Sequence, residues 1–240
     1  MSSGMYSTLS GAMAAGKNLQ IISNNLANIN NSGFKRDETH FEALFRNRMQ
    51  ATLGKGINFS RISNTSTDYS QGGLKKTGAS LDLAVEGTGF FKVAGEEGFS
   101  YTRKGNFQLR ENGDLVTPSG HQVVGQNGPI NLPSSRVSVD EDGTIRGEDG
   151  VVGQLSLYDV ADHSALKKQG DNLWNYTGQG EDEIVTGRKL HQGFLEESNV
   201  EPMREMTELI KTKRLFQAYQ KNLKAYGDMA KQANEIGRLG

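Results

Sequence analysis

The start of the chain repeats hydrophobic and small residues at the spacing of an α-helix. Over residues 4–28 these positions recur alternately every four and every three residues, which places them on one helix face. The small side chains among them would let a partner helix approach closely. A cluster of turn-forming residues that includes Gly33 ends the pattern. The stripe comprises Met5, Leu9, Ala12, Gly16, Leu19, Ser23 and Leu26, and Ile22 widens it.

A second helical pattern spans residues 200–237 at the other end of the chain. Pro202 suits the first helical turn, and we expect Ser198 or Asn199 near the N-cap. A helix of this length exceeds the globular average and is typical of coiled coils or of packing between subunits. Packing of both helices on their own domain is the ordinary alternative, and the pattern leaves it open. The seam comprises Phe216, Tyr219, Leu223, Tyr226, Ala230 and Ala233, and Met206, Leu209 and Ile210 extend it.

Between the two helices the hydrophobic period changes to two, which indicates β-strands. Residues 81–85 alternate, and the Asn-Gly and Asp-Gly pairs at 112–113 and 142–143 predict tight hairpins. Residues 151–160 are expected to form either a strand pair or one long strand. The chain has 30 glycines but 4 prolines, which favours many turns over low-complexity sequence. Residues 80–190 are therefore predicted to form an all-β domain.

The resulting fold class is α+β, with long N- and C-terminal helices paired as a coiled coil and a central all-β domain between them. In the connector, residues 41–49 resemble a short helix and residues 60–73 an extended polar segment. The predicted domains are residues 1–30 together with 200–240 as the coiled-coil domain, 31–79 as an extended connector, 80–190 as the β-rich domain and 191–199 as a return link.

Charge and composition narrow the class of function. The net charge is -1, with basic ends and an acidic middle, and no basic cluster indicates binding to nucleic acid or to anionic membranes. The absence of cysteine excludes disulfides, a thiol nucleophile and a zinc-thiolate site. No apolar run is long enough for a membrane span, and we expect no cleaved signal peptide at the N-terminus.

Candidate catalytic chemistry does not rise above background. The four histidines are isolated from one another, and Asp140-x-Asp142-Gly143 lacks the remaining ligands of a calcium loop. Gly87-Thr88-Gly89 precedes two phenylalanines and not a helix, which disfavours a phosphate site. A spatial pair of carboxylates stays open, because such pairs leave no sequence spacing. We therefore predict no catalytic residue, no cofactor, no metal and no small-molecule substrate.

The end of the first helical pattern carries a specific motif. Residues 23–30, Ser-Asn-Asn-Leu-Ala-Asn-Ile-Asn, are followed by Ser-Gly-Phe-Lys at 32–35, and this resembles the N-terminal signature of bacterial flagellar axial proteins. Asparagines can satisfy the free backbone groups of a helix end, glycine permits the turn, and phenylalanine anchors the exit. The motif residues are Asn24, Asn25, Ala27, Asn28, Gly33, Phe34 and Lys35.

Three further stretches are similar to the same family. Residues 81–91 resemble the start of its β domain, and residues 101–120 resemble the hairpins that follow. Residues 193–200, which end in Ser198, Asn199 and Val200, lead into the C-terminal helix as they do in these proteins. The resemblance covers nearly the whole chain in order. The length and the single β domain are more like a rod subunit than the longer hook subunit.

The resemblance implies a structural, non-enzymatic rod subunit that polymerises into the axial drive shaft between motor and hook. Its terminal helices would form the inner tube, and its partners would be copies of itself and other proximal and distal rod subunits. The flagellar type III apparatus would export it unfolded, without a cleaved signal, to the part of the basal body that crosses the periplasm. The chain is more similar to the proximal rod type, because distal rod subunits usually carry a longer insertion where residues 46–75 lie. The distal type, a non-flagellar β-domain binding module and an enzyme remain the alternatives.

The seam assignment predicts that Leu26→Asp or Leu223→Asp blocks incorporation into the polymer while the β domain stays folded. The reason is the cost of burying an unpaired carboxylate between helices. Co-purification of each variant with basal bodies measures incorporation, and circular dichroism checks the β domain. Normal incorporation of both variants would contradict the seam.

Overall fold

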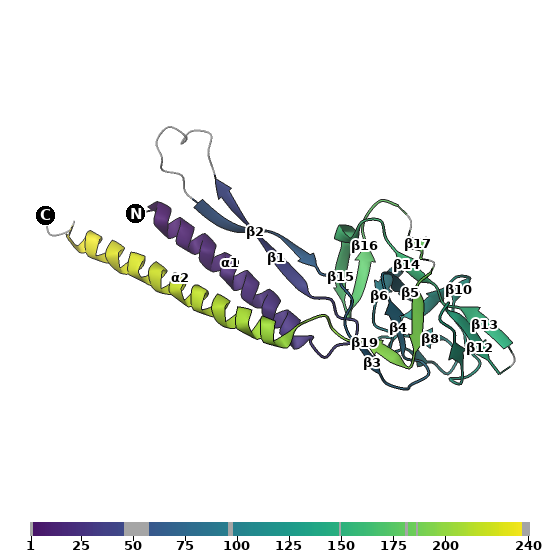
Figure 1. The fold of residues 1–240 in the computed structure, drawn as a ribbon. Helices are drawn as coiled ribbons and strands as arrows, with labels where there is room; N and C mark the ends of the chain where they lie inside the picture. Colours follow the sequence, from purple (N-terminus) through teal and green to yellow (C-terminus); the bar gives the residue numbers. More distant parts are fainter. Residues whose placement is uncertain are drawn as a thin grey trace. The chain divides into compact units, whose positions relative to one another are not determined.

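The computed structural model describes residues 2–45, 58–95, 98–148, 150–180, 182–185 and 187–236 (Figure 1). Within them, two long helices lie at the ends of the chain and strands fill the part between, which confirms the α+β class. The chain divides into two compact units. The helical unit comprises Met1–Ala27, Asp37–Asp68 and Val200–Gly240, and the β unit comprises Asn28–Arg36 and Tyr69–Asn199.

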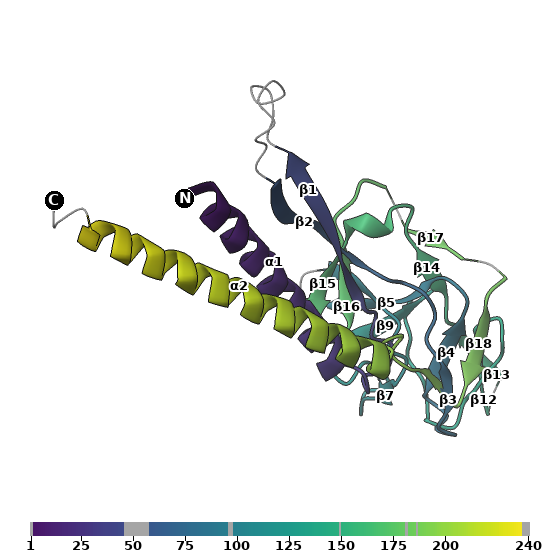
Figure 2. The ribbon, with the colours of Figure 1, turned by 60° about the vertical axis from the view of Figure 1, so that its left-hand side comes forward.

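The helical unit contains α1 (Ser2–Ala27), α2 (Pro202–Ile236) and a hairpin of β1 (Asp37–Phe45) and β2 (Asn58–Thr67). Figures 1 and 2 show α1 between α2 and the hairpin, and α1 contacts all three other elements. Both predicted helices are therefore confirmed, and their observed bounds differ from the predicted ones by one or two residues.

The predicted cap of the second helix is wrong. The Glu205 N–H donates to the carbonyl of Glu201 at 3.0 Å, which places Glu201 in the N-cap position directly before Pro202. Proline fixes the start because its backbone angle is already helical and the N–H it lacks is not needed in the first turn. Ser198 and Asn199 lie outside the helix, at the end of the β unit.

The predicted short helix over residues 41–49 is also wrong where the structure describes it. Phe41–Phe45 belongs to β1, which pairs antiparallel with β2 so that Phe41 faces Ile62 and Phe45 faces Asn58. The local spacing of apolar residues fits a helix, but a partner strand further along the chain satisfies the backbone instead. Residues 46–49 lie outside the described part of the chain. The extended conformation expected from residue 60 onward is confirmed through Thr67.

The β unit is antiparallel throughout its described strand pairs. Its largest sheet follows the order β15-β16-β6-β5-β9-β8-β7, and β10, β14 and β17 attach to it. The smaller sheets are β11-β12-β13, β18-β4 and β19-β3. The first strands are β3 (Leu74–Lys76), β4 (Leu83–Glu86), β5 (Phe90–Gly95), β6 (Gly98–Thr102), β7 (Gln108–Leu109), β8 (Leu115–Val116), β9 (Gln122–Gly125) and β10 (Gly128–Pro129). The others are β11 (Ser138–Val139), β12 (Thr144–Gly147), β13 (Gly150–Gln154), β14 (Leu157–Asp159), β15 (Leu166–Gly170), β16 (Leu173–Tyr176), β17 (Glu183–Ile184), β18 (Lys189–Gln192) and β19 (Phe194–Glu196), with a 3-10 turn, η1 (His163–Ala165).

The two predicted hairpins are confirmed. Gly113, at a φ of 87°, turns between β7 and β8, and Gly143, at a φ of 88°, turns between β11 and β12. Residues 151–160 form two strands and not one, because β13 belongs to the three-stranded sheet and β14 pairs with β5.

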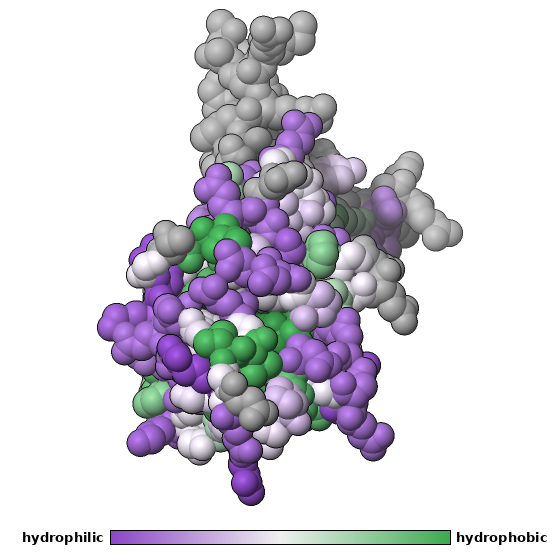
Figure 3. Space-filling model, turned by 90° about the vertical axis from the view of Figure 1, so that its right-hand side faces the viewer, coloured by the Kyte–Doolittle hydropathy of each residue, from purple (hydrophilic) through white to green (hydrophobic). Residues whose placement is uncertain are grey.

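The core of the β unit lies on both faces of β5. Phe91 and Val93 point into the larger apolar cluster, and Phe90 points into a second cluster with Tyr101 and Trp174. Alternate side chains of a strand face opposite sides, so adjacent phenylalanines fill two separate cores. Figure 3 views the chain from the side that lies on the right in Figure 1. The surface seen there is mainly hydrophilic, with hydrophobic side chains gathered in small patches.

Candidate assembly interface

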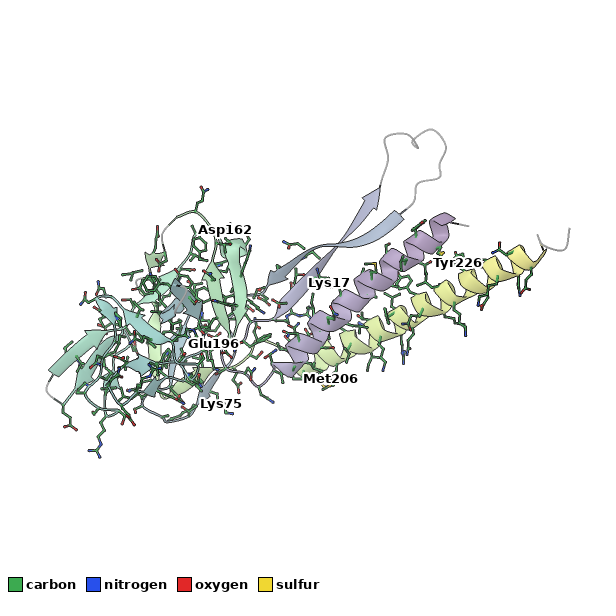
Figure 4. The ribbon with its side chains drawn as sticks, turned by 180° about the vertical axis from the view of Figure 1, so that it is seen from behind. Lys17, Lys75, Asp162, Glu196, Met206 and Tyr226 are labelled. Carbon is green, nitrogen blue, oxygen red and sulfur yellow. The ribbon has the colours of Figure 1, made fainter. Side chains whose placement is uncertain are left out.

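Glycines on α1 face aromatic rings on α2. Gly4 lies against Tyr226 and Gly11 against Tyr219, and further along the antiparallel pair Gly16 lies against Phe216. A Cβ atom on Gly11 would come within 2.5 Å of Tyr219 Cζ, so the ring occupies the space that glycine leaves free. Figure 4 shows Tyr226 beside α1 in this arrangement.

Two side-chain amides of α1, the half-buried Asn18 and the buried Asn25, add directional bonds to this packing. Asn18 joins three elements, because its Nδ2 donates to Thr212 Oγ1 at 3.3 Å on α2 and its Oδ1 accepts from Thr39 Oγ1 at 2.9 Å on β1. Asn25 forms two bonds with the backbone of Asp37, each 3.0 Å long. Polar groups inside a helix interface specify register and orientation, since a shift would leave them unpaired.

The large side chains of the predicted α2 seam lie partly buried in the structure, whereas some of the predicted positions of α1 lie exposed. Phe216, Tyr219, Leu223 and Tyr226 are half-buried on α2. On α1, Ile22 is buried and Leu19 and Leu26 are half-buried, but Leu9 is 41 % exposed and Met5 is also exposed. The α1 residues that lie against the aromatic rings of α2 are glycines. The sequence did contain a signal for the contacts of Gly4 and Gly11. These glycines are seven residues apart, and so are Tyr219 and Tyr226.

The helical unit leaves much apolar surface uncovered. Lys17 is the one charged residue in the 26 residues of α1, so charged side chains cover little of the surface of this helix. Contiguous apolar surface on a helix of this kind indicates contact with other proteins. In the described part of the helices, the exposed large apolar residues are Met5, Tyr6, Leu9 and Met13 on α1, and Met203, Met206, Ile210, Leu215 and Met229 on α2.

Gly33 and Phe34 of the motif dock into the β unit. The Gly33 N–H donates to the carbonyl of Glu196 at 2.8 Å, and its φ is 67°. A Cβ atom at this position would lie 2.5 Å from the carbonyl carbon of Arg103, so space and backbone angle both require glycine. Phe34 is buried, and Lys168 Nζ lies 4.5 Å from the centre of its ring.

Lys35 continues into a buried group of charges, and Figure 4 labels Glu196 at its centre. The Lys35 Nζ lies 2.6 Å from Glu196 Oε1, and Arg103 Nη1 lies 3.2 Å from Glu196 Oε2. Lys35 and Glu196 are both 0 % exposed. Burial lowers the pKa of the Arg103 guanidinium, and the adjacent Glu196 carboxylate opposes that shift.

The Asn-rich and Ser-Asn-Val parts of the motif take different positions. Asn28 Oδ1 accepts from Asn31 Nδ2 at 2.7 Å just beyond α1, whereas Asn24 and Ala27 are exposed on the helix. Asn199 Oδ1 accepts from the Arg36 N–H at 2.8 Å, and Asn199 Nδ2 donates to the Ser70 carbonyl at 3.2 Å. Ser198 is half-buried and Val200 is buried.

The chain is similar to known proteins over its whole length. Three family models match the chain: "Flagella basal body rod protein" over residues 5–35, "Flagellar hook protein FlgE/F/G D1 domain" over 84–147, and "Flagellar basal body rod FlgEFG protein C-terminal" over 191–236. The flagellar basal-body rod protein FlgF of Caulobacter vibrioides is 34 % identical, covering 100 % of this chain and 99 % of that protein. The chain belongs to the flagellar basal-body rod protein family.

FlgG proteins are similar to a comparable degree. The FlgG of Buchnera aphidicola from Schizaphis graminum is 34 % identical over 91 % of this chain and 94 % of its own length. The FlgG of Bacillus subtilis is 33 % identical over 90 % and 92 %. The family is structural and not enzymatic, so this chain is a structural subunit of the basal-body rod that assembles with other rod subunits.

Each of the three matched regions of this rod protein supplies one charge of the buried group. Lys35 ends the first region, Arg103 lies in the second and Glu196 lies in the third. The family motifs, which are far apart in the sequence, therefore meet at one carboxylate. No helix in the described ranges is long and apolar enough to cross a membrane.

We expect Gly33→Ala to destabilise the β unit more than Gly78→Ala does. Both glycines have positive φ, which costs an alanine about 1 kcal/mol, but a Cβ at Gly33 also meets the backbone of Arg103. The second effect raises the expected loss at Gly33 to about 3 kcal/mol. At Gly78 no atom lies within 4 Å of the added Cβ, which makes it the matched control. Urea unfolding of both variants measures the difference, and equal losses would refute the docking role of Gly33.

Proposed function

We propose that this chain is a proximal rod subunit of the FlgF type, within the periplasmic part of the drive shaft that links motor and hook. The observation that carries the proposal is the likeness to the Caulobacter FlgF, which spans 100 % of this chain and 99 % of its relative. The FlgG type is the alternative, supported by the equal identity of the Buchnera FlgG over a smaller share of both chains.

The two helices of the subunit form a coiled coil in the assembled rod. Rings from α2 fit against glycines of α1, and the seven-residue spacing on both sides is the repeat of a left-handed coiled coil. The apolar side chains left exposed on both helices then pack against the helices of neighbouring subunits. Together these helices build the inner tube, and the β unit makes the outer contacts.

The subunit reaches this position through the flagellar type III export apparatus, unfolded and without a cleaved signal. The chain has no cysteine, so no disulfide can form before the chain has passed through a narrow channel. Folding then follows at the growing end of the rod, where neighbours cover the apolar helix faces.

The order of assembly tests the proximal assignment. In cells that lack this chain, we expect basal bodies without the distal rod subunit, because a proximal segment must be present before the distal one is added. In cells that lack the distal subunit, this chain is expected to remain in purified basal bodies. Loss of this chain from those basal bodies would assign it to the distal type instead.

The exposed helix face gives a second prediction. Met13 is 69 % exposed in the subunit, so Met13→Glu is expected to change the free energy of unfolding by no more than about 0.5 kcal/mol. In the rod the same carboxylate would be buried against a neighbour, and incorporation into basal bodies is expected to fall sharply. Met13→Leu keeps an apolar side chain at the same position and is the control. Equal incorporation of Met13→Glu and wild type would show that this face is not an interface.

A further inference from the structure

The chain passes between the helical unit and the β unit four times, after residues 27, 36, 68 and 199. Inside the β unit, three of these connecting segments are bonded directly to one another. Asn199 accepts from the Arg36 N–H at 2.8 Å, donates through its side chain to the Ser70 carbonyl at 3.2 Å, and donates through its backbone to the Phe34 carbonyl at 3.4 Å. The segments at 34–36, 70 and 199 are therefore joined where they leave the unit.

The buried group of Lys35, Arg103 and Glu196 forms further hydrogen bonds with the same segments. Lys35 Nζ donates to Glu196 Oε1 and to the Ser70 carbonyl, both at 2.6 Å. The Gly72 N–H donates to Glu196 Oε1 at 3.0 Å. Arg103 Nη1 donates to Glu196 Oε2 at 3.2 Å, and its Nη2 donates to the Gly87 carbonyl at 2.7 Å. One carboxylate thus ties the connecting segments to Arg103, the residue that directly follows β6.

Stability alone does not explain three charges in this place. Removing charges from water is costly, and well-packed apolar residues often stabilise a protein as much as a buried ion pair does. Apolar contacts are non-directional and permit side chains to slide past one another. Short bonds to charged groups are directional and strong, so they resist displacement of one segment relative to another.

We propose that Lys35, Arg103 and Glu196 form a mechanical clamp that fixes the connecting segments to the β unit. A load arriving along any one of these segments is then shared by all of them, and none is pulled out of the unit alone. This inference rests on the proposed function, because only a subunit of a rotating shaft carries such a load.

Hydrogen exchange on the purified full chain tests the clamp itself. Glu196→Gln leaves two buried cations without a counter-charge, so exchange of the Gly33 and Gly72 amides is expected to rise about a hundredfold or more. Lys35→Met keeps a neutral Glu196–Arg103 pair, and its expected rise is about tenfold. The amides of β5 and β9 should keep their wild-type exchange in Lys35→Met. Uniform acceleration across the whole β unit in Lys35→Met would show a general loss of stability and overturn the proposal.

A matched control comes from another ion pair of the same unit. Lys92 Nζ lies 2.7 Å from Asp182 Oδ2, and the two side chains are 13 % and 15 % exposed. Lys92→Met removes the same kind of cation as Lys35→Met, away from the connecting segments. Its exchange at Gly33 and Gly72 is expected to equal that of the wild type. A rise there as large as in Lys35→Met would contradict a specific clamp.

Swimming under load tests the mechanical role in cells with the chromosomal gene replaced. Lys35→Met cells are expected to assemble rods and swim as wild type in dilute buffer, but to lose swimming in viscous medium and shed hooks with broken rods. Lys92→Met cells should swim as wild type in both. Wild-type swimming of Lys35→Met at high viscosity would overturn the proposal, and so would a failure of the folded variant to assemble. Intact rods and normal motility in a deletion strain would instead refute the proposed function.

Discussion

The carboxylate of Glu196 accepts bonds from Lys35, from Arg103 and from the backbone of Gly72, and Glu196 is fully buried. The carboxylate and the two cations stabilise one another, because a buried charge without a counter-charge would destabilise the fold. The position of Gly33 against the Arg103 backbone and the burial of Phe34 follow from the same geometry. The adjacent residues Gly33, Phe34 and Lys35 are therefore positioned by residues far away in the sequence, namely Arg103, Lys168 and Glu196.

The helical unit is held together by a different kind of chemistry. Its interior relies on rings fitted against glycines and on neutral amides such as Asn18, and its exterior leaves large apolar side chains uncovered. The two units divide the demands on a rod subunit. The β unit joins its connecting segments through buried charges, while the helices leave large apolar side chains exposed.

Local patterns predicted both helices, the hairpins at Gly113 and Gly143, and the extended segment after Ser60, because each depends on neighbours in the sequence. The errors occurred where a distant partner decides the structure. Phe41 to Phe45 have helical spacing but pair with β2, and the α1 face turned towards α2 carries glycines that bury no apolar side chain of their own. Lys35 and Glu196 are 161 residues apart, so no periodicity could join them. The family resemblance located both residues without giving the reason for either.

Among the residues whose burial the structure describes, methionine supplies five of the nine large apolar residues exposed on the two helices. Its side chain is unbranched and carries a polarisable sulfur, so it fills irregular gaps against surfaces of different shape. A shaft made of successive protein types contains boundaries at which a subunit meets its own kind on one side and a different sequence on the other. If the proposed interface forms, a methionine surface can pack against both neighbours with the same residues.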